Sequence, residues 1–439
     1  MNRRVNKLTG IRTLSVTNLF RVPNAPVKQI FKFLFLISLF WGYGFPSAMA
    51  MTWHDYELLL LEKNVNLQSS HWTVTANRYA REAIGATAWP VLSFSTAGSH
   101  TDSTISSDLF SYSLVGTYTL FDGGAIAAKI HSASVQLEQV QLDEIKNWIN
   151  LRNAAKLTYI EATYSQTKIK LLNQILERLK RNENFMKVKF EGGQQPRWVY
   201  LSAKNSRLAI EQQLKTAQRD ARRAQKQLAV YLGKNVWQED NHFESLNTTV
   251  NVDLNGDYQN FISANIDVLK AQKNIENFQA LLDVEKANLW PLITLRGSSG
   301  LSGTPAFFPS QTTTTLGLNL SLSLFDANVR QNNIAQREAQ ISSAQLEAYA
   351  VQLDAAQNIL STLDILRDDF EKLPLSQESL SVAQERLETT EELYLAGRAL
   401  YLEWDQAQQT LTNAQLTLLD SQYQLNRAMA NFEKALQLR

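Results

Sequence analysis

Two stretches of this sequence share one change of pattern: GTYTLFDGGA at residues 116–125 and LSLSLFDANV at residues 320–329. In each stretch, apolar residues alternate with small polar residues up to a Phe-Asp pair, after which a long segment has helical periodicity. Alternation with period two predicts a strand, and a period near 3.6 predicts a helix. We therefore expect the chain to pass from strand to helix at Phe121-Asp122 and again, 204 positions later, at Phe325-Asp326.

The repetition extends beyond these pairs. Gly193 recurs as Gly397 at the same offset of 204 residues, and residues of the segment around Leu214 recur around Leu418. Self-similarity at a fixed spacing predicts a tandem repeat of one structural unit. We interpret residues 51–245 as the first structural repeat and residues 246–439 as the second, each with a helix, a β-hairpin and a long helical hairpin.

The first part of each unit is predicted to be a helix followed by two strands. Helical stretches at 53–88 and 258–289 lead into Trp89-Pro90 and Trp290-Pro291, which are 201 positions apart and open the strand segments. The polar, turn-rich links SHTDSTISSDL and LSGTPAFFPSQTT are typical of hairpin connections. Each unit should therefore contribute one β-hairpin.

The second part of each unit is predicted to be a very long helix and a return helix. Residues 125–190 contain neither Gly nor Pro, and at 1.5 Å per residue they make a rod of about 100 Å. The counterpart at 327–395 contains only Pro374, where we expect a kink. The glycines at 193 and 397 are expected to end the two rods.

The return helices carry a 3,4 spacing of apolar and small residues, which demands a partner helix and a left-handed supercoil. In the first copy these residues are Ile210, Leu214, Ala217, Ala221, Ala224, Leu228 and Tyr231. In the second they are Trp404, Ala407, Leu411, Ala414, Leu418, Ser421, Leu425, Ala428, Phe432 and Ala435.

The four strands are predicted to span a membrane. In LGLNLSLSLF the leucines occupy one face, and Gly, Asn and Ser occupy the other, as in strands between lipid and water. Four strands cannot close a barrel, since the smallest have eight, and open edges are not tolerated in lipid. The protein should therefore be an oligomer with a shared barrel. The alternative is a soluble sheet packed on a core, although no element is evident to cover it.

The N-terminal 50 residues differ from the rest and are interpreted as a signal peptide. They hold seven Lys or Arg and no acidic residue, and an apolar run at 33–45 precedes the small-x-small site Ala48-Met49-Ala50. The run is too short for a spanning helix, which needs about 20 residues. A short hydrophobic anchor is the alternative. The chain has no cysteine, which excludes disulfides and thiolate metal sites.

Charge and motifs argue against nucleic-acid binding and enzymatic chemistry. Without the first 50 residues, 36 basic residues face 42 acidic ones, a net charge of −6, which is unfavourable for binding nucleic acid. The five histidines form no close ligand pair, and GxSxG and P-loop motifs are absent, so we predict no metal, cofactor or catalytic site. The basic cluster Arg219, Arg222, Arg223 and Lys226 is interpreted as a solvated helix face, with adaptor contact as the functional alternative.

The sequence resembles the outer membrane efflux protein family, the TolC-type channel-tunnels, across residues 51–439. The resemblance lies in the ordered set of FDGG and FDAN junctions, strand hairpins and helical hairpins with heptad seams. The resemblance implies a mostly α fold with a membrane β part: long antiparallel helical hairpins form an α-barrel, and four strands per chain contribute to a trimeric 12-stranded β-barrel in the outer membrane. It also implies a passive duct for multidrug efflux or type I protein secretion. The implied partners are outer-membrane lipid, a periplasmic adaptor (membrane fusion) protein and an inner-membrane transporter of the ABC or RND type.

The same resemblance places a periplasmic gate near the two hairpin turns. Tyr394 lies three residues before Gly397, as in the family, and Arg398 comes one residue earlier than the usual basic position. Glu403 matches the first acid of the family's constriction ring. Gln406 stands where a second acid is common, with Asp405 adjacent. The first hairpin lacks the acidic partner that the family pattern has there, and Glu191 is the acidic residue nearest to that position. These six residues are the gate candidates, and they are weighed against ordinary solvated turn residues.

Two functions from different classes follow. The first is an outer-membrane export duct, in which Phe121, Asp122, Phe325 and Asp326 mark the membrane interface. The Phe side chains are of the interfacial type, and the Asp residues are expected to cap the following helices. The second is a non-channel coiled-coil scaffold or adhesin in the periplasm or at the surface. The duct predicts detergent-dependent trimers and conductance, and the scaffold predicts extraction without detergent.

Overall fold

The structure is a computed structural model that describes residues 51–101, 107–234, 243, 258–304 and 307–437. The predicted signal peptide at 1–50 and the predicted repeat boundary at 245 lie outside these described residues. Residues 51–437 are described here as one unit, since the chain divides into a unit at 1–50 and a second one after it.

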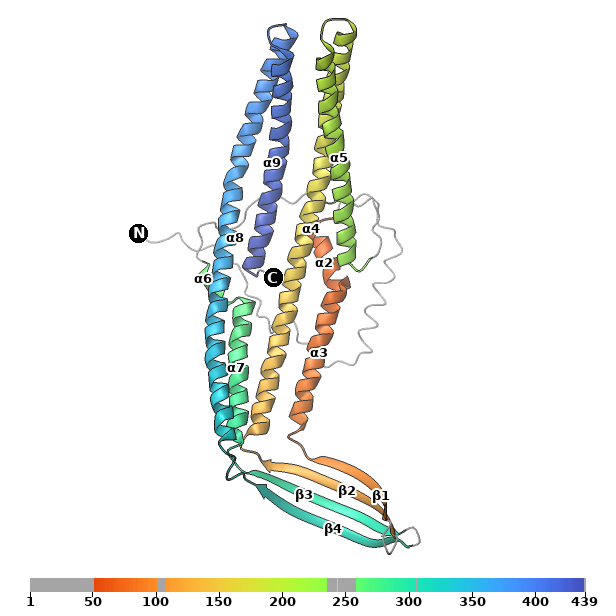
Figure 1. The fold of residues 1–439 in the computed structure, drawn as a ribbon, viewed down its shortest axis with the longest axis vertical. Coiled ribbons are helices and arrows are strands. Elements are labelled where there is room, and N and C mark those ends of the chain that lie inside the picture. The colour runs from red at the N-terminus through yellow and green to blue at the C-terminus, as the bar shows by residue number, and fades with distance from the viewer. Residues whose placement is uncertain (1–50, 102–106, 235–242, 244–257, 305–306, 438–439) are drawn as a thin grey trace, which may run out of the picture. The chain divides into compact units, whose positions relative to one another are not determined.

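The same order of elements occurs twice along the chain (Figure 1). The first half contains α2 (Trp53–Lys63), α3 (Val65–Ala86), β1 (Val91–Thr101), β2 (Ser107–Phe121), α4 (Ala125–Glu191) and α5 (Arg197–Tyr231). The second half contains α6 (Gln259–Ser263), α7 (Ile266–Ala287), β3 (Leu292–Thr304), β4 (Phe307–Ser321), α8 (Val329–Leu395) and α9 (Tyr401–Ala435). The long helices and the return helices match in length: α4 and α8 have 67 residues each, and α5 and α9 have 35 each. The predicted long rods and return helices are therefore confirmed.

The first helical stretch of each half is broken by a buried asparagine, where the sequence pattern predicts one continuous helix. Asn64 ends α2 and begins α3, and its side-chain oxygen accepts hydrogen bonds from the backbone N–H groups of Asn66 (2.9 Å) and Leu67 (3.1 Å). Asn265 caps α7 in the same way, accepting from the N–H of Asp267 at 2.9 Å. Asparagine side chains favour this N-cap position because they satisfy free backbone donors.

The helix α8 runs without interruption through Pro374. Proline removes the backbone donor that would bond to the carbonyl four residues earlier, and its ring crowds that carbonyl. The packing of α8 against α9 along its length keeps the segment helical on both sides. The kink expected at Pro374 stays a prediction.

The helices form a single layer in which each packs on its neighbours. Near the sheet the order is α3–α4–α7–α8, and in the hairpins away from the sheet it is α5–α4–α9–α8 (Figure 1). The helix α4 therefore lies inside the layer along its whole length. One edge of the layer is α8, and the other edge is α3 continued by α5.

The two helical hairpins are held by apolar seams that the 3,4 spacing predicts. In α5, the predicted seam residues from Ile210 to Leu228 are buried, and several of them pack on the apolar face of α4. In α9, Leu425, Ala428 and Phe432 pack on α8. A further core lies where α2 meets α4 and α5, and the Tyr56 hydroxyl donates to the carbonyl of Leu228 at 2.8 Å.

The four strands form one antiparallel sheet in the order β1-β2-β3-β4. Residues directly opposite each other share a face, so the register places Tyr118, Leu295 and Leu318 on one face. The other face carries mainly Ser, Thr, Gly and Asn, together with Val91, Val115 and Arg296, which confirms the predicted apolar and polar faces. Within the described residues, the outer edges of β1 and β4 have no partner strand.

The strand boundaries differ from the predicted ones in two ways. The strands reach into both polar links, with β1 continuing to Thr101 and β4 starting at Phe307. At the other end, β4 stops at Ser321, although its alternation continues to Phe325, because Ser321 already pairs with Leu292, the first residue of β3. Side-chain alternation alone does not show where the partner strand ends.

Candidate functional site

The turns at the free ends of the two helical hairpins have the same backbone geometry. Gly193 has a φ of 70° and Gly397 a φ of 72°, a conformation that favours glycine. The N–H after each glycine bonds back five residues, Gln194 to Lys189 at 2.9 Å and Arg398 to Leu393 at 2.8 Å. These bonds satisfy carbonyls at the helix end, as in a Schellman motif, and they reverse the chain into the return helix.

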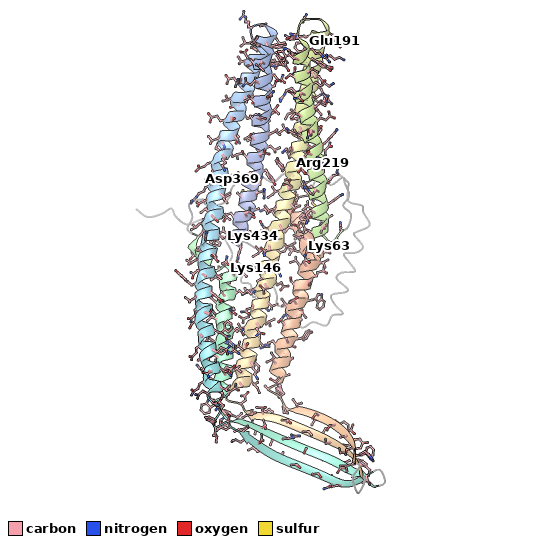
Figure 2. All side chains as sticks on the ribbon, viewed as in Figure 1. Lys63, Lys146, Glu191, Arg219, Asp369 and Lys434 are labelled. Atoms are coloured by element: carbon pink, nitrogen blue, oxygen red, sulfur yellow. The ribbon has the colours of Figure 1, made fainter. Side chains whose placement is uncertain are left out.

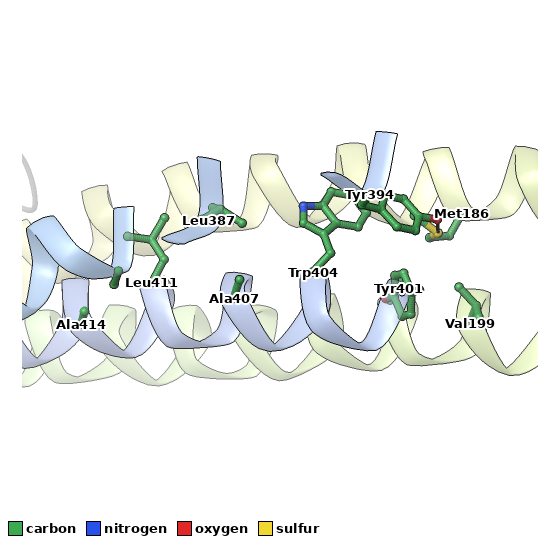
Figure 3. Packing of buried hydrophobic residues seen from close by; sticks show 11 residues of the cluster. Met186, Val199, Leu387, Tyr394, Tyr401, Trp404, Ala407, Leu411 and Ala414 are labelled. Atoms are coloured by element: carbon green, nitrogen blue, oxygen red, sulfur yellow. Dashed lines mark hydrogen bonds between the residues drawn. The ribbon is translucent and has the colours of Figure 1, made fainter. Parts of the chain in front are cut away.

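An aromatic cluster fills the space between the two turns (Figure 3). The rings of Tyr394 and Trp404 stack at 4.9 Å between centroids with an interplanar angle of 11°, and Tyr401 meets both rings edge-on. The first hairpin supplies Met186, whose sulfur lies 3.7 Å from the Tyr394 hydroxyl, and Lys189, whose ammonium lies 4.9 Å from the Tyr394 ring centroid. Both hairpin ends thus share one core.

A buried polar group lies directly beside this cluster. Asp405 is 5% exposed, accepts a hydrogen bond from Gln409 at 2.9 Å, and lies beside the Tyr401 hydroxyl. Burial raises the pKa values of both Asp405 and Tyr401 above their usual range. Asn182 and Ser202 of the first hairpin also approach the Tyr401 hydroxyl, yet among the described residues none meets it with hydrogen-bond geometry. The polar atoms here are enclosed but incompletely satisfied.

The polar contacts continue from this point along the boundary between the hairpins, where α4 meets α9. Asn182 donates to Gln408 at 3.2 Å and Arg178 donates to Thr412 at 2.9 Å. Burial lowers the pKa of the Arg178 guanidinium. Nearer the middle of the helices, the pairs are Tyr164 with Asp420, Glu161 with Tyr423, and Lys156 with Glu433. We call this row of residues the inter-hairpin seam.

The structure separates the six gate candidates into buried and exposed groups. Tyr394 and Asp405 are buried inside the chain's own packing, whereas Arg398, Gln406, Glu191 and Glu403 are exposed. Glu191 lies at the end of the first hairpin (Figure 2) and pairs with Lys187 at 3.8 Å. Glu403 reaches back to accept the N–H of Leu400 at 3.1 Å, a contact that stabilises the first turn of α9.

Several residues at the tip were not among the predicted site residues. Trp404 was predicted only as a seam residue, and Tyr401, Met186 and Asn182 were not singled out. The heptad spacing could have indicated that Trp404 is buried, because it begins the α9 seam. No local pattern indicates Asn182, since its partner Gln408 is 226 positions away.

At the junctions between strand and helix, both aspartates bind the helix starts, but they are not the N-cap residues. The N-caps are Gly124 and Asn328, two positions later, both with left-handed backbone. Asp122 accepts from the N–H of Ile126 at 2.6 Å, and Asp326 accepts from that of Arg330 at 3.3 Å. The predicted N-cap position is therefore wrong, although the carboxylates do bind free donors of the first turn.

The structure also shows why the first junction contains glycine at position 123. Gly123 has a φ of 68°, and a Cβ atom there would lie 2.5 Å from the carbonyl oxygen of Ala287. Only glycine permits this approach of the junction to the end of α7. Beside the junctions, Phe121 is 43% exposed and Phe325 is 87% exposed.

The described residues contain neither a candidate metal site nor a candidate membrane-spanning helix. No group of three or more His, Asp or Glu side chains is placed to hold a metal ion in this part of the chain. None of the helices within the described ranges combines the length and apolar character needed to cross a membrane.

Long paired helices continue from an amphipathic sheet whose two outer edges have no partner strand within the described residues. The family model for outer membrane efflux proteins matches residues 59–234 and 258–436, most of the chain, and the protein belongs to this family. It is accordingly an efflux channel protein of the outer membrane with a periplasmic helical part, and it is not an enzyme.

Solved structures show the same fold at low sequence identity. The chain is similar to the CmeC outer membrane channel of Campylobacter jejuni, with a TM-score of 0.80, 15% identity and coverage of 88% of this chain and 85% of CmeC. For the open state of the MtrE outer membrane channel of Neisseria gonorrhoeae, the TM-score is 0.77 at 16% identity, with 88% of both chains covered. For VceC of Vibrio cholerae these values are 0.77 and 15%, with 88% and 96% covered. No curated protein sequence matches significantly.

Proposed function

We propose that three copies of this chain form a passive export duct across the outer membrane and the periplasm, as the outer component of a tripartite system. The observation that carries this proposal is the pair of open edges on an amphipathic sheet. A sheet edge in lipid leaves backbone N–H and C=O groups without hydrogen bonds, so a four-stranded sheet requires further strands. Three copies supply twelve strands, and β1 of each copy pairs with β4 of the next.

The helical layer supports the same neighbour contact. On α3, Val65, Trp72 and Tyr79 are spaced by seven residues and are 63–70% exposed. On α8, Leu346, Tyr349 and Leu353 follow a 3,4 spacing and are at least half exposed. Heptad-spaced apolar side chains require a partner helix. These two unpartnered seams lie at opposite edges of the layer, so that α3 of one copy packs on α8 of its neighbour.

Cysteine cross-linking tests this arrangement, because the chain has no cysteine of its own. We expect the double variant Ser95→Cys/Thr315→Cys, which marks β1 and β4, to give covalent trimers with bifunctional thiol reagents in outer-membrane fractions. Each single variant is the matched control and should give no trimer. Cross-links confined to monomers, or a protein extracted by salt without detergent, would contradict the duct and favour a coiled-coil scaffold.

At the periplasmic end, the duct is proposed to close through the tips of the helical hairpins, with Glu403 from three copies forming an acidic constriction that selects cations. Its exposed carboxylate and its position in the first turn of α9 support this role. The Tyr394, Trp404 and Asp405 group is proposed to hold each subunit's two hairpins in the closed arrangement. Arg398, Gln406 and Glu191 lie exposed around the turns and are proposed as contacts between copies.

The Glu403 proposal is tested with two variants that differ in one property. Glu403→Gln removes the charge but keeps the hydrogen bond to Leu400, whereas Glu403→Ala removes both. We expect both variants to lose cation selectivity and block by multivalent cations in single-channel recordings. Unchanged selectivity in both would contradict the acidic constriction, and a change in Glu403→Ala alone would assign Glu403 to helix stability only.

The tip is also the proposed docking site for a periplasmic adaptor protein, which connects the duct to an inner-membrane transporter of the ABC or RND type. Leu400 and Leu402 are 70% and 62% exposed beside the second turn, and such side chains provide apolar contacts for a partner. The transported substrate is tested by deletion of the gene: small-molecule efflux predicts drug or metal sensitivity, and secretion predicts loss of one exported polypeptide.

A further inference from the structure

The polar face of the sheet carries one charged residue within the described strands, Arg296 on β3. Its directly opposite neighbours are Thr117 on β2 and Gly317 on β4, so these three residues lie on the same face. The residues two positions away on β3 are Thr294 and Ser298, and the register is continuous across this part of the sheet. The neighbours of Arg296 on this face are therefore small and uncharged.

The face that Arg296 occupies is the one that meets water. The opposite face contains Leu295 and its partners Tyr118 and Leu318, and Leu318 is 66% exposed in the single chain. Hydrophobic residues of this kind form the lipid-facing band of a membrane strand, and charges face the lumen. If Arg296 pointed into lipid, these apolar side chains would line the water-filled interior instead.

The charge of Arg296 is not neutralised by the chain. Among the described residues, no carboxylate forms an ion pair with this guanidinium, and the side chain is exposed. The carboxylates at this end of the sheet, Asp122 and Asp326, have partners at the helix starts. Asp122 accepts from the N–H groups of Gly124 at 3.0 Å and Ile126 at 2.6 Å, and Asp326 pairs with Arg330 at 2.5 Å.

The position along the strand is also defined. Arg296 is the fifth residue of β3, counted from Leu292 at the helix end of the sheet, which places it about 13 Å into the strand. Gly317 opposite it leaves open space, since a Cβ atom there would meet nothing within 4 Å. The guanidinium can therefore extend into the lumen beside the junction with the helices.

We propose that Arg296 is a selectivity residue of the duct: three copies form a ring of guanidinium groups in the barrel that binds multivalent oxyanions such as polycarboxylates and phosphates. This proposal depends on the trimeric duct proposed for the chain. Guanidinium groups bind carboxylate and phosphate through paired, charge-assisted hydrogen bonds, and rings of Arg select anions in pores. The duct then has a cationic ring in the barrel and an acidic constriction at the periplasmic tip, which act on opposite classes of ion.

The test uses the purified protein in planar bilayers, with citrate as the trivalent anion probe added from the barrel side. We expect Arg296→Gln to shift the reversal potential in a KCl gradient toward cation selectivity. The citrate concentration for half block should rise by at least about tenfold, because charge-assisted hydrogen bonds from three copies are lost. Arg296→Lys keeps the charge and should keep the selectivity.

Two further variants control for effects on folding. Arg296→Gln/Thr294→Arg moves the guanidinium to the same face two residues away and should restore citrate block. Gly317→Glu leaves Arg296 in place and neutralises it from the opposite strand, and it should reproduce the effect of Arg296→Gln. Conducting Arg296→Gln and Gly317→Glu channels with unchanged reversal potential and citrate block would overturn the proposal. A parent protein without trimers or conductance would instead overturn the duct itself.

Discussion

The two kinds of helix contact in this molecule differ in chemistry. Within each hairpin, the helices are joined by apolar residues, such as Ile359, Leu363 and Leu366 of α8 against Leu425 and Phe432 of α9. Between the hairpins, beyond the aromatic cluster that the two tips share, α4 meets α9 largely through the inter-hairpin seam of charged, amide and hydroxyl side chains. Both contacts run along α9, which is antiparallel to α4 and to α8, and α9 packs more extensively on α8 than on α4.

This difference indicates which contacts are permanent and which can change. Apolar burial is non-directional and contributes about 25 cal/mol per Å², so separating the helices of one hairpin is costly. A hydrogen bond between neutral groups contributes only about 0.5–1.5 kcal/mol net, and one to a charged group about 1.5–3 kcal/mol, since water replaces the partner when the pair separates. We infer that each hairpin moves as one body and that rearrangement of the tip takes place at the inter-hairpin seam.

The largest effect on stability is expected from truncating a buried apolar side chain within a hairpin. Leu366 is 0% exposed, and Leu366→Ala should lower the free energy of unfolding by about 2–5 kcal/mol through lost burial and a residual cavity. Leu366→Met conserves the volume and is the matched control, with an expected cost below about 1.5 kcal/mol. Thermal unfolding measured by helical circular dichroism checks both; equal costs would show that the apolar seam tolerates cavities.

A smaller effect is expected in the inter-hairpin seam. Asn182→Ala removes the donor to Gln408, and the buried amide left unpaired should cost about 1–3 kcal/mol. Replacing both partners, as Asn182→Leu/Gln408→Met, removes the unpaired group and should be close to neutral in stability. The double variant should also lengthen closed dwell times in single-channel recordings. Dwell times at the parent value would remove the inferred role of the inter-hairpin seam in opening.

The third effect depends on pH. Burial raises the pKa of Asp405 above its ordinary value of 3.8, so the folded tip binds this proton more tightly than the unfolded chain does. The stability of the tip is therefore greatest below pH 3.8 and falls as the pH rises through the raised pKa. Asp405→Asn should flatten this dependence and protect the tip at neutral pH.

Hydrogen exchange of the first turns of α9, followed from about pH 4 to about pH 7 after correction for the intrinsic rate, measures this effect of Asp405. Asp364→Asn on α8 is the control, because the Asp364 side chain is 72% exposed and lies outside the tip. Parallel pH profiles in the parent protein and Asp405→Asn would contradict the prediction.

The smallest effect is expected at a polar pair that interrupts the apolar seam of the second hairpin. The hydroxyls of Ser376 and Ser421 lie 2.8 Å apart between α8 and α9. Changing both to alanine leaves no unpaired partner and should alter the free energy of unfolding by less than about 0.5 kcal/mol. Urea unfolding of the double variant checks this, and Ser421→Ala alone should cost more than the pair. A large loss in the double variant would show that polar pairs support the hairpins.

Much of the fold could be predicted from local patterns. Three local patterns predicted it: the alternation before Phe121 and Phe325, the glycine-free segment after the first junction, and the glycines at 193 and 397. The structure confirms the strands, the long helices and the turns that these patterns indicate. The heptad spacing in α9 also predicted the burial of Trp404, because helical periodicity relates directly to which face packs.

Other features depended on contacts that a local pattern does not contain. The breaks at Asn64 and Asn265 look like ordinary helix interior in sequence, yet these asparagines cap a second helix. The burial of Asp405 follows from the aromatic residues and the first hairpin closing around it. The family resemblance placed Asp405 among the gate candidates, beside Gln406, and no local pattern indicated that it is buried.

The sequence by itself determined the kinds of element, their order, the lengths of the long helices and the two faces of the strands, because backbone geometry and side-chain periodicity act over a few residues. Only the tertiary structure decided that the hairpins meet through an aromatic cluster and a polar seam, that Tyr394 stacks on Trp404, and that Arg296 lies opposite Gly317. Those relations join residues from different helices or strands, and the partner of each is set by how the elements pack.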